Sequence, residues 1–157
     1  MTEISFHFNI PQRVPYVCRL LRKATAKGAQ LLVTGPREEL EAIDRMLWQL
    51  SPVDFVGHAW MEASSGGDEG EGAEHAAMAV ARERARVWLS ESVCASDRHR
   101  VLVNLHASIA EGFEQFERLI EIVSLDASDR NDARQRWRYY GQRGYQIIRH
   151  DVQVTGG

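Results

Sequence analysis

Apolar and polar positions alternate with two different periods along the first third of the chain. Segment 4–8 alternates residue by residue, which is typical of a strand, and 30–34 is a continuous apolar run of the kind found in buried parallel strands. Between them, apolar side chains recur at helical spacing over 13–27, and Gly28 follows where a helix C-terminal cap is expected. A second helix is predicted with Pro36 at its first position. This strand-helix-strand-helix order predicts parallel pairing with right-handed crossovers.

The remainder of the chain continues the alternation of strands and helices. The segment 51–61 is predicted to be irregular at Pro52 and Gly57 but is rich in large apolar groups, and 62–76 is predicted to be a flexible acidic loop. The other expected elements are a short helix at 75–86, strands at 87–90, 101–105, 119–124 and 145–154, a loop with a helical turn at 107–116, and a helix at 128–141 with Gly144 as the turn after it. We therefore predict one domain over 1–157, a three-layer α/β/α fold in which a mostly parallel sheet has helices on both faces (Rossmann-like).

The composition fits this fold class and indicates the cellular compartment in which the protein is expected. The 157 residues are 44% hydrophobic and 26% charged, as in ordinary globular domains. The two cysteines, Cys18 and Cys94, do not form a disulfide framework and are expected to stay reduced. No apolar run approaches the length of a membrane span, and the first residues lack the plan of a signal peptide. We expect a soluble, cytoplasmic protein with no membrane association.

Charge is distributed unevenly. The net charge of −3 argues against a protein that coats nucleic acid. Residues 64–75 contain four acidic groups and no Lys or Arg, whereas 126–150 contain six arginines and three acidic groups. A basic patch on an acidic protein indicates selective contact with an anion or an acidic peptide.

The helix expected at 128–141 concentrates these arginines. At 100° per residue, one quarter-turn sector holds Arg130, Arg134, Trp137, Arg138 and Gly141. Trp137 also borders an apolar face formed with Ala133 and Tyr140. Arginine suits bidentate recognition of carboxylate or phosphate, and the Trp ring could hold an apolar side chain or stack on a base. A merely solvated basic face is the alternative.

No pattern in the sequence predicts catalysis, a cofactor or a metal site. Gly35 and Pro36 lie between a strand and a helix, but neither GxxxxGK[ST] nor GxGxxG is present. Cys94, His99 and His106 come closest to a metal cluster, yet their spacing matches no zinc motif. No nucleophile elbow or HExxH motif occurs. We expect no catalytic residues, no cofactor and no bound metal.

Trp48 and Phe55 are large aromatic residues near the end of the second helix and just beyond it. They either pack in the core, as aromatic side chains usually do, or form an exposed apolar patch that marks a partner site.

Several blocks resemble the chi subunit family of bacterial DNA polymerase III. The most specific lies within 129–152; the others are 101–105, 113–124, the helix ending Leu47-Trp48, and Phe55-x-x-His58. Within the block 129–152 the matching positions are Ala133, Arg134, Arg136, Trp137, Arg138, Tyr140, Gly144 and Tyr145. The chain departs from the family where Gly57 replaces the usual Pro, in a longer and more acidic 62–86, and in the link 105–113.

The resemblance implies a non-catalytic accessory subunit with an α/β fold. Chi proteins bind the psi subunit, which ties them to the clamp loader, and the acidic, Phe-terminated C-terminal tail of single-stranded-DNA-binding protein. The residues implied for the tail are Arg130, Arg134, Trp137, Arg138, Gly144 and Tyr145. Those implied for psi are Trp48 and Phe55. Contact with DNA would be mainly indirect.

Two other functions remain open at this stage. The same Arg/Trp surface could bind single-stranded nucleic acid directly. A small nucleotide-dependent enzyme on the same fold is the third hypothesis, although the missing phosphate-binding motif argues against it.

Overall fold

The computed structural model describes residues 2–49, 58–60, 85–93 and 99–152. The described elements are β1 (Glu3–Ile10), α1 (Arg13–Ala26), β2 (Leu31–Thr34), α2 (Arg37–Trp48), β3 (His58–Trp60), β4 (Val87–Ser90), β5 (Val101–Asn104), the 3-10 turn η2 (Phe113–Gln115), β6 (Arg118–Ser124), α4 (Ala127–Gln142) and β7 (Ile147–Asp151). Most strands and helices therefore lie within a few residues of their predicted positions.

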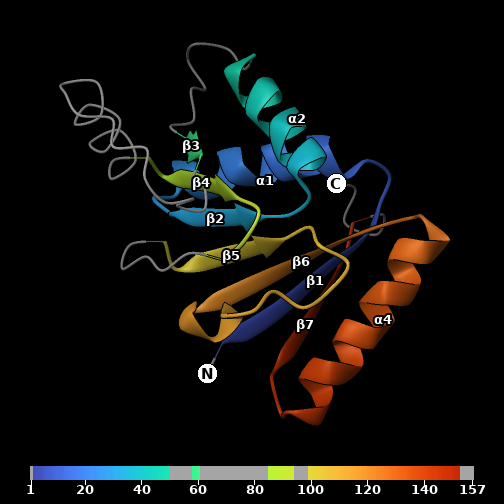
Figure 1. Cartoon of the computed structure of the whole chain (residues 1–157). Coiled ribbons are helices and arrows are strands. Elements are labelled where there is room, and N and C mark those ends of the chain that lie inside the picture. The colour runs from blue at the N-terminus through green and yellow to red at the C-terminus, as the bar shows by residue number, and fades with distance from the viewer. Residues whose placement is uncertain (1, 50–57, 61–84, 94–98, 153–157) are drawn as a thin grey trace, which may run out of the picture.

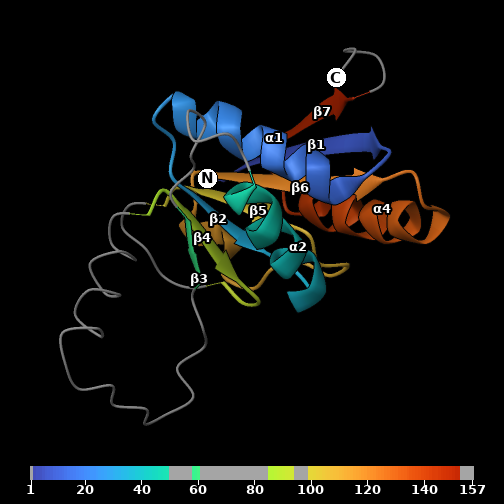
Figure 2. The same cartoon turned by 90° about the horizontal axis from the view of Figure 1, so that it is seen from above.

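The strands form one seven-stranded sheet in the order β3-β4-β2-β5-β6-β1-β7. Every neighbouring pair is parallel. Helices α1 and α2 cover one face of the sheet and α4 covers the other, as Figures 1 and 2 show. The predicted mostly parallel α/β fold with helices on both faces is confirmed.

Successive strand residues face opposite layers, which builds two apolar cores. On the α1/α2 side, Val17 and Ile43 pack in the same cluster as Val33 of the sheet. On the α4 side, Tyr140 belongs to a cluster that includes Ile4 and Phe6 of β1. Because both faces of the sheet are buried, the central strands read as continuous apolar runs.

The ends of the first two helices follow their sequence signals, with one difference. Gly28 has φ +90, the left-handed conformation that glycine adopts without steric cost. Pro36 was predicted at the first helical position but is the N-cap of α2, because its ψ of 143 is extended. Its carbonyl already accepts from the amide of Leu40 at 3.1 Å.

A short strand that was not predicted lies within 51–61, whose irregularity was expected at Pro52 and Gly57, both outside the described residues. His58–Trp60 forms β3, which pairs in parallel with β4. The remaining residues of that segment, Phe55 included, lie outside the described part of the chain, as do the predicted loop 62–76 and nearly all of the helix predicted at 75–86.

Two backbone features shape the sheet edge next to α4. The pairing of β1 with β6 shifts register between His7 and Ile10, and Asn9 within this bulge has φ 63. Gly144, with φ 79, ends the turn region after α4 and leads the chain toward β7. No helix among the described residues is long and apolar enough to cross a bilayer.

Candidate functional site

Helix α4 begins immediately after β6 because three polar groups fix its first turn. The Asp126 side chain accepts from the amide of Asp129 at 3.2 Å, so Asp126 is a side-chain N-cap. The Asp129 carboxylate accepts from the amide of Ser124 at 2.7 Å. The carboxylate of Asp129 also lies at the positive end of the helix, where negative charge is favourable.

A buried polar network fixes the rotation of α4 about its axis. Arg136 donates to the Glu121 carboxylate at 2.6 Å, and the Tyr140 hydroxyl donates to it at 2.9 Å. Asn104 donates to the same carboxylate at 3.0 Å. The side chains of Arg136 and Glu121 are 2% and 0% exposed. Burial, and then the adjacent Glu121 carboxylate, raise the pKa of Tyr140 well above its usual value, so its hydroxyl remains a donor.

This network removes one of the six arginines of 126–150 from the predicted basic patch. Arg136 contributes to the count of six, but it is buried and ion-paired with Glu121. Its Nη1 donates to the carbonyl of Ala107 at 2.7 Å. Its Nη2 is buried with no hydrogen-bond partner among the described residues. Arg136 therefore belongs to the interior of the protein.

The opposite side of α4 carries arginines whose charges are not neutralised. Arg130, Arg134 and Arg138 are exposed and recur at four-residue spacing. No ion pair joins them to a carboxylate in the described part of the chain. Like charges at this spacing destabilise a helix by about 0.2–0.5 kcal/mol per pair. An anionic ligand would remove that repulsion.

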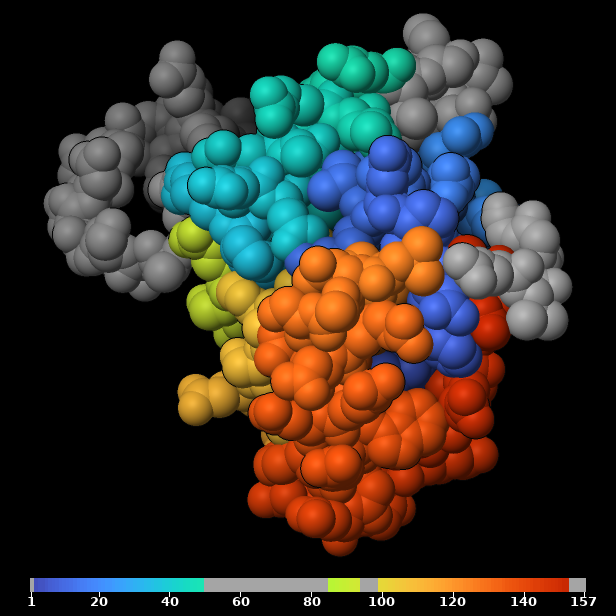
Figure 3. Space-filling model, turned by 90° about the vertical axis from the view of Figure 1, so that its right-hand side faces the viewer, coloured from blue at the N-terminus to red at the C-terminus, as the bar shows by residue number. Residues whose placement is uncertain are grey.

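A groove of about 440 Å³ lies between α4, β1 and β7. In Figure 3 it is the hollow between orange α4 and red β7, with blue β1 at its base. We call it the α4 groove, and its lining residues are Phe6, Phe8, Asn9, Val123, Arg130, Ala133, Arg134, Trp137 and Arg149. Among the described residues, the lining combines three arginines with aromatic rings and contains no acidic residue.

Aromatic rings in contact with one another form the base of the groove. The rings of Phe6 and Trp137 are 5.0 Å apart, and Phe6 also meets the ring of Tyr140 at 6.0 Å. The guanidinium of Arg149 lies 5.6 Å from the centre of the Phe8 ring and 5.9 Å from that of Trp137. The groove can therefore hold an apolar side chain against rings while arginines surround it.

The structure brings together half of the residues expected to bind a tail. Arg130, Arg134 and Trp137 line the groove. Arg138 is exposed on the same helix without lining it. Tyr145 is partly buried, with its ring 5.4 Å from that of Phe113, and Gly144 forms the preceding turn. Gly144 and Tyr145 thus help position α4 and β7 rather than line the groove.

Five lining residues were not singled out from the sequence as site residues: Phe6, Phe8, Asn9, Val123 and Arg149. Each lies on a strand that pairs with a strand distant in sequence, and Arg149 pairs in register with Phe6. The alternation of 4–8 did place Phe6 and Phe8 on one face. The missing information was that β7 lies beside β1.

Trp48, expected either in the core or on a partner surface, is the last residue of α2 and is 62% exposed. Core packing is therefore wrong for Trp48. Phe55, its expected companion, lies outside the described residues.

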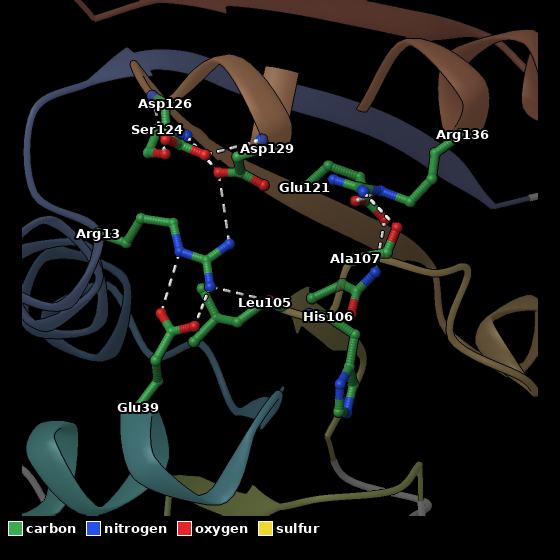
Figure 4. A network of polar contacts seen from close by, with 11 residues as sticks. Arg13, Glu39, Leu105, His106, Ala107, Glu121, Ser124, Asp126, Asp129 and Arg136 are labelled. Carbon is green, nitrogen blue, oxygen red and sulfur yellow. Dashed lines mark hydrogen bonds and ion pairs between the residues drawn. The ribbon is translucent and has the colours of Figure 1, made fainter. Parts of the chain in front are cut away.

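A second hollow, of about 580 Å³, opens at the carboxyl ends of β1, β2, β5 and β6, where parallel α/β sheets commonly bind ligands. We call it the carboxyl-edge crevice, and its lining residues are Gln12, Arg13, Val14, Pro15, Pro36, Glu39, Leu105, Ala107, Ser124, Asp126, Ser128, Asp129 and Asp132. Arg13 spans it: the guanidinium pairs with Glu39 of α2 and, at 3.5 Å, with Asp129 of α4, and it donates to the carbonyl of Leu105 at 3.0 Å (Figure 4).

These contacts leave the crevice unsuited to a phosphate group. Four carboxylates line it against one arginine, and that arginine is already paired. The carboxylates of Asp126 and Asp129 also lie at the start of α4, the end of a helix that would otherwise attract an anion. This crevice therefore gives no support to the hypothesis of a nucleotide-dependent enzyme.

His99 and His106, two of the three residues nearest to a metal motif, each contact a backbone carbonyl. His99 is buried, contacts the Ala85 carbonyl at 3.0 Å and stacks on Trp88. His106 contacts the Glu91 carbonyl at 2.7 Å. Cys94 lies outside the described residues, and within the described ranges no three His, Cys, Asp or Glu side chains form a metal-binding group. Cys18 is a free thiol in the core, and burial raises its pKa to about 11.

Two comparisons with known proteins each match nearly the whole chain. The family model described as DNA polymerase III chi subunit, HolC, matches residues 1–148. The DNA polymerase III subunit chi of Pseudomonas aeruginosa PAO1 is 26% identical over 156 residues, spanning 96% of this chain and 96% of that protein.

Proposed function

This chain belongs to the DNA polymerase III chi subunit family, whose members are replication accessory subunits, and on that premise we propose that it is a non-catalytic link between two replication proteins. Its α4 groove binds the acidic, Phe-terminated tail of single-stranded-DNA-binding protein. A second surface binds psi and so connects the chain to the clamp loader.

One observation carries the tail-binding proposal: the α4 groove combines an aromatic base with arginines that lack counter-ions among the described residues. Guanidiniums form charge-assisted, bidentate hydrogen bonds with carboxylates. The rings of Phe6 and Trp137 offer an apolar surface to the terminal Phe of a tail. An acidic peptide with an apolar end is therefore the complementary ligand.

The decisive experiment is calorimetric titration of the full chain with a synthetic tail peptide. Arg134→Gln is expected to weaken binding by about 1–3 kcal/mol, the range for a lost charge-assisted contact. Arg143→Gln is the matched control, since Arg143 is also an exposed arginine at the end of α4 but lies over the ring of Tyr139, at 3.6 Å, outside the groove. Equal affinities for all three proteins would refute the assignment.

Arg138→Ala extends the same titration along the helix. Arg138 was implied as a tail contact, and a direct contact predicts a loss in the same range of about 1–3 kcal/mol. Because Arg138 does not line the groove, we expect its effect to be smaller than that of Arg134. A peptide reaching past the groove toward the C-terminal half of α4 would equalise the two effects.

The psi-binding surface is proposed around Trp48, with Phe55 as its second member. An exposed Trp at a helix end is the type of residue that anchors protein interfaces. Trp48→Ala should weaken capture of purified psi while leaving tail binding unchanged. Loss of both activities together would indicate misfolding rather than a lost interface.

Direct binding of single-stranded nucleic acid is the alternative use of the α4 groove. Trp137 and Phe8 beside arginines resemble the stacking platforms of single-strand binders. Fluorescence anisotropy with a labelled oligonucleotide, without any tail protein, separates the two functions. Tight binding at physiological salt would favour the alternative, whereas the net charge of −3 opposes it.

A further inference from the structure

Arg149 is the one arginine of the α4 groove that does not belong to α4. It lies on β7, one residue past the range matched by the family model, and pairs in register with Phe6 of β1. Arg130 and Arg134 reach the groove from the helix, so the groove has cationic groups on both its helix side and its sheet side. A basic stripe on α4 alone would place cationic groups only on the helix side of the groove.

The guanidinium of Arg149 lies beside two aromatic rings of the groove. It lies 5.6 Å from the centre of the Phe8 ring and 5.9 Å from that of Trp137, within the distance over which a cation is attracted to an aromatic face. Because the guanidinium is planar, contact with rings leaves its N–H groups at the edge free to bind an anion. Attraction to the rings favours this position of the Arg149 side chain before a ligand arrives, which would lower the entropy lost on binding.

The carboxylate nearest to Arg149 along β7 does not neutralise it. Asp151 accepts a hydrogen bond at 3.0 Å from Asn9, the bulge residue with positive φ. No ion pair connects Arg149 with a carboxylate of the described chain. The bulge in β1 thus gives Asp151 a hydrogen-bond donor on the same sheet edge, and the Arg149 guanidinium is not engaged by a carboxylate of the described chain.

We propose that Arg149 is a specificity-determining residue of the groove: it binds a peptide carboxylate from the sheet side, different from the carboxylate bound by Arg134. The α4 groove then selects a peptide with two carboxylates that flank an apolar side chain. This inference rests on the proposed tail-binding function and adds a rule about which acidic peptides are accepted.

The test is a set of titrations with the full chain and three synthetic peptides. The first peptide carries the acidic, Phe-terminated tail; the second has an amidated C-terminus; the third has its acidic side chains replaced by amides. Arg149→Gln should weaken binding of the first peptide about tenfold, as expected for a lost charge-assisted contact. Arg149→Lys, which keeps the charge but not the planar group, should recover only part of that loss.

The peptides identify which carboxylate each arginine binds. We expect the effect of Arg149→Gln to vanish with one of the two modified peptides, and the effect of Arg134→Gln to vanish with the other. Arg143→Gln, with the same change in charge, should stay within about twofold of the parent protein. Thermal melting of each variant checks that this exposed β7 position tolerates the substitution.

Three outcomes would overturn the inference. If the parent chain binds the tail but Arg149→Gln binds equally well, Arg149 is not a recognition residue and the tail-binding function stands. If Arg149 and Arg134 lose their effects with the same peptide, both bind one carboxylate and the two-carboxylate rule is wrong. If the parent chain binds no tail peptide, the proposed function fails, and the inference fails with it.

Discussion

The carboxyl-edge crevice and the α4 groove are both hollows next to α4, and arginines lie at both. The crevice is the larger, at about 580 Å³ against 440 Å³, and occupies the position where parallel α/β sheets commonly bind ligands. Its Arg13, however, is paired with carboxylates of α2 and α4. Arg134 and Arg149 of the groove have no such partner in the described chain. The comparison teaches that the pairing of charges, rather than the size of a hollow, identifies the binding surface.

The same contrast divides the arginines of α4 itself. Arg136 is buried against Glu121, whereas Arg134 and Arg138, two residues to either side, are exposed. Paired arginines should therefore matter for stability and unpaired arginines for binding. Each of the following experiments tests that division.

Arg136→Ala should have the largest effect on stability. It leaves the Glu121 carboxylate buried without its counter-ion, which costs about 3–5 kcal/mol of unfolding free energy. Urea unfolding measures the loss, with Arg138→Ala as the exposed control, expected to change stability by no more than about 0.5 kcal/mol. Similar losses in the two variants would show that the interior and exterior arginines of α4 do not differ.

Arg13→Gln should have an intermediate effect and separates the two hollows most directly. Losing the contacts with Glu39, Asp129 and the Leu105 carbonyl should cost about 1–3 kcal/mol of stability. Tail affinity, measured at a temperature where the variant is folded, should stay within about twofold of the parent value. A large loss of affinity without loss of stability would move the binding surface to the crevice.

Acidification acts on the opposite face of β1. Burial, followed by the charges of His150 and Arg118, lowers the pKa of His7 from 6.5 to about 4. Between these values the unfolded chain binds a proton that the folded chain does not, so stability falls as pH drops from 6.5 toward 4. His7→Gln should flatten this dependence in unfolding experiments at pH 5–7.

Groove arginines keep their charge over that pH range, so tail affinity provides the contrast. At pH 5.5 and pH 7 the folded parent chain should bind the tail with similar affinity. A steep change of tail affinity with pH that disappears in His7→Gln would show that the α1 face of β1 is coupled to the groove. The two faces of β1 would then not act independently.

Much of the fold was predictable because local signals agreed with the final structure. Apolar periodicity located the strands and helices, and Gly28 and Gly144 marked turns that require a positive φ. Pro36 was misplaced by one residue, since a fixed φ is compatible with both the N-cap and the first helical position. The three-residue β3 was missed because so short a strand has no detectable period.

The groove was only half predictable. Arg130, Arg134 and Trp137 share a helix face, and helical geometry alone brings them together. Phe8 and Arg149 meet them through the pairing of β1 with β7, which sequence spacing does not encode. Nor can a helical wheel show that Arg136 is paired, because its partner Glu121 lies on another element.

The placement of β1 between β6 and β7 has a consequence for synthesis on the ribosome. Ile4 pairs with both Leu119 and Ile147, so β1 must wait for β6 and β7, which are synthesised much later, before it is paired on both sides. Such distant pairing makes folding slower than local pairing would. A nascent chain therefore completes its α4 groove only after β7 has been added, and a chain truncated before β7 would compete poorly with the parent protein for the tail.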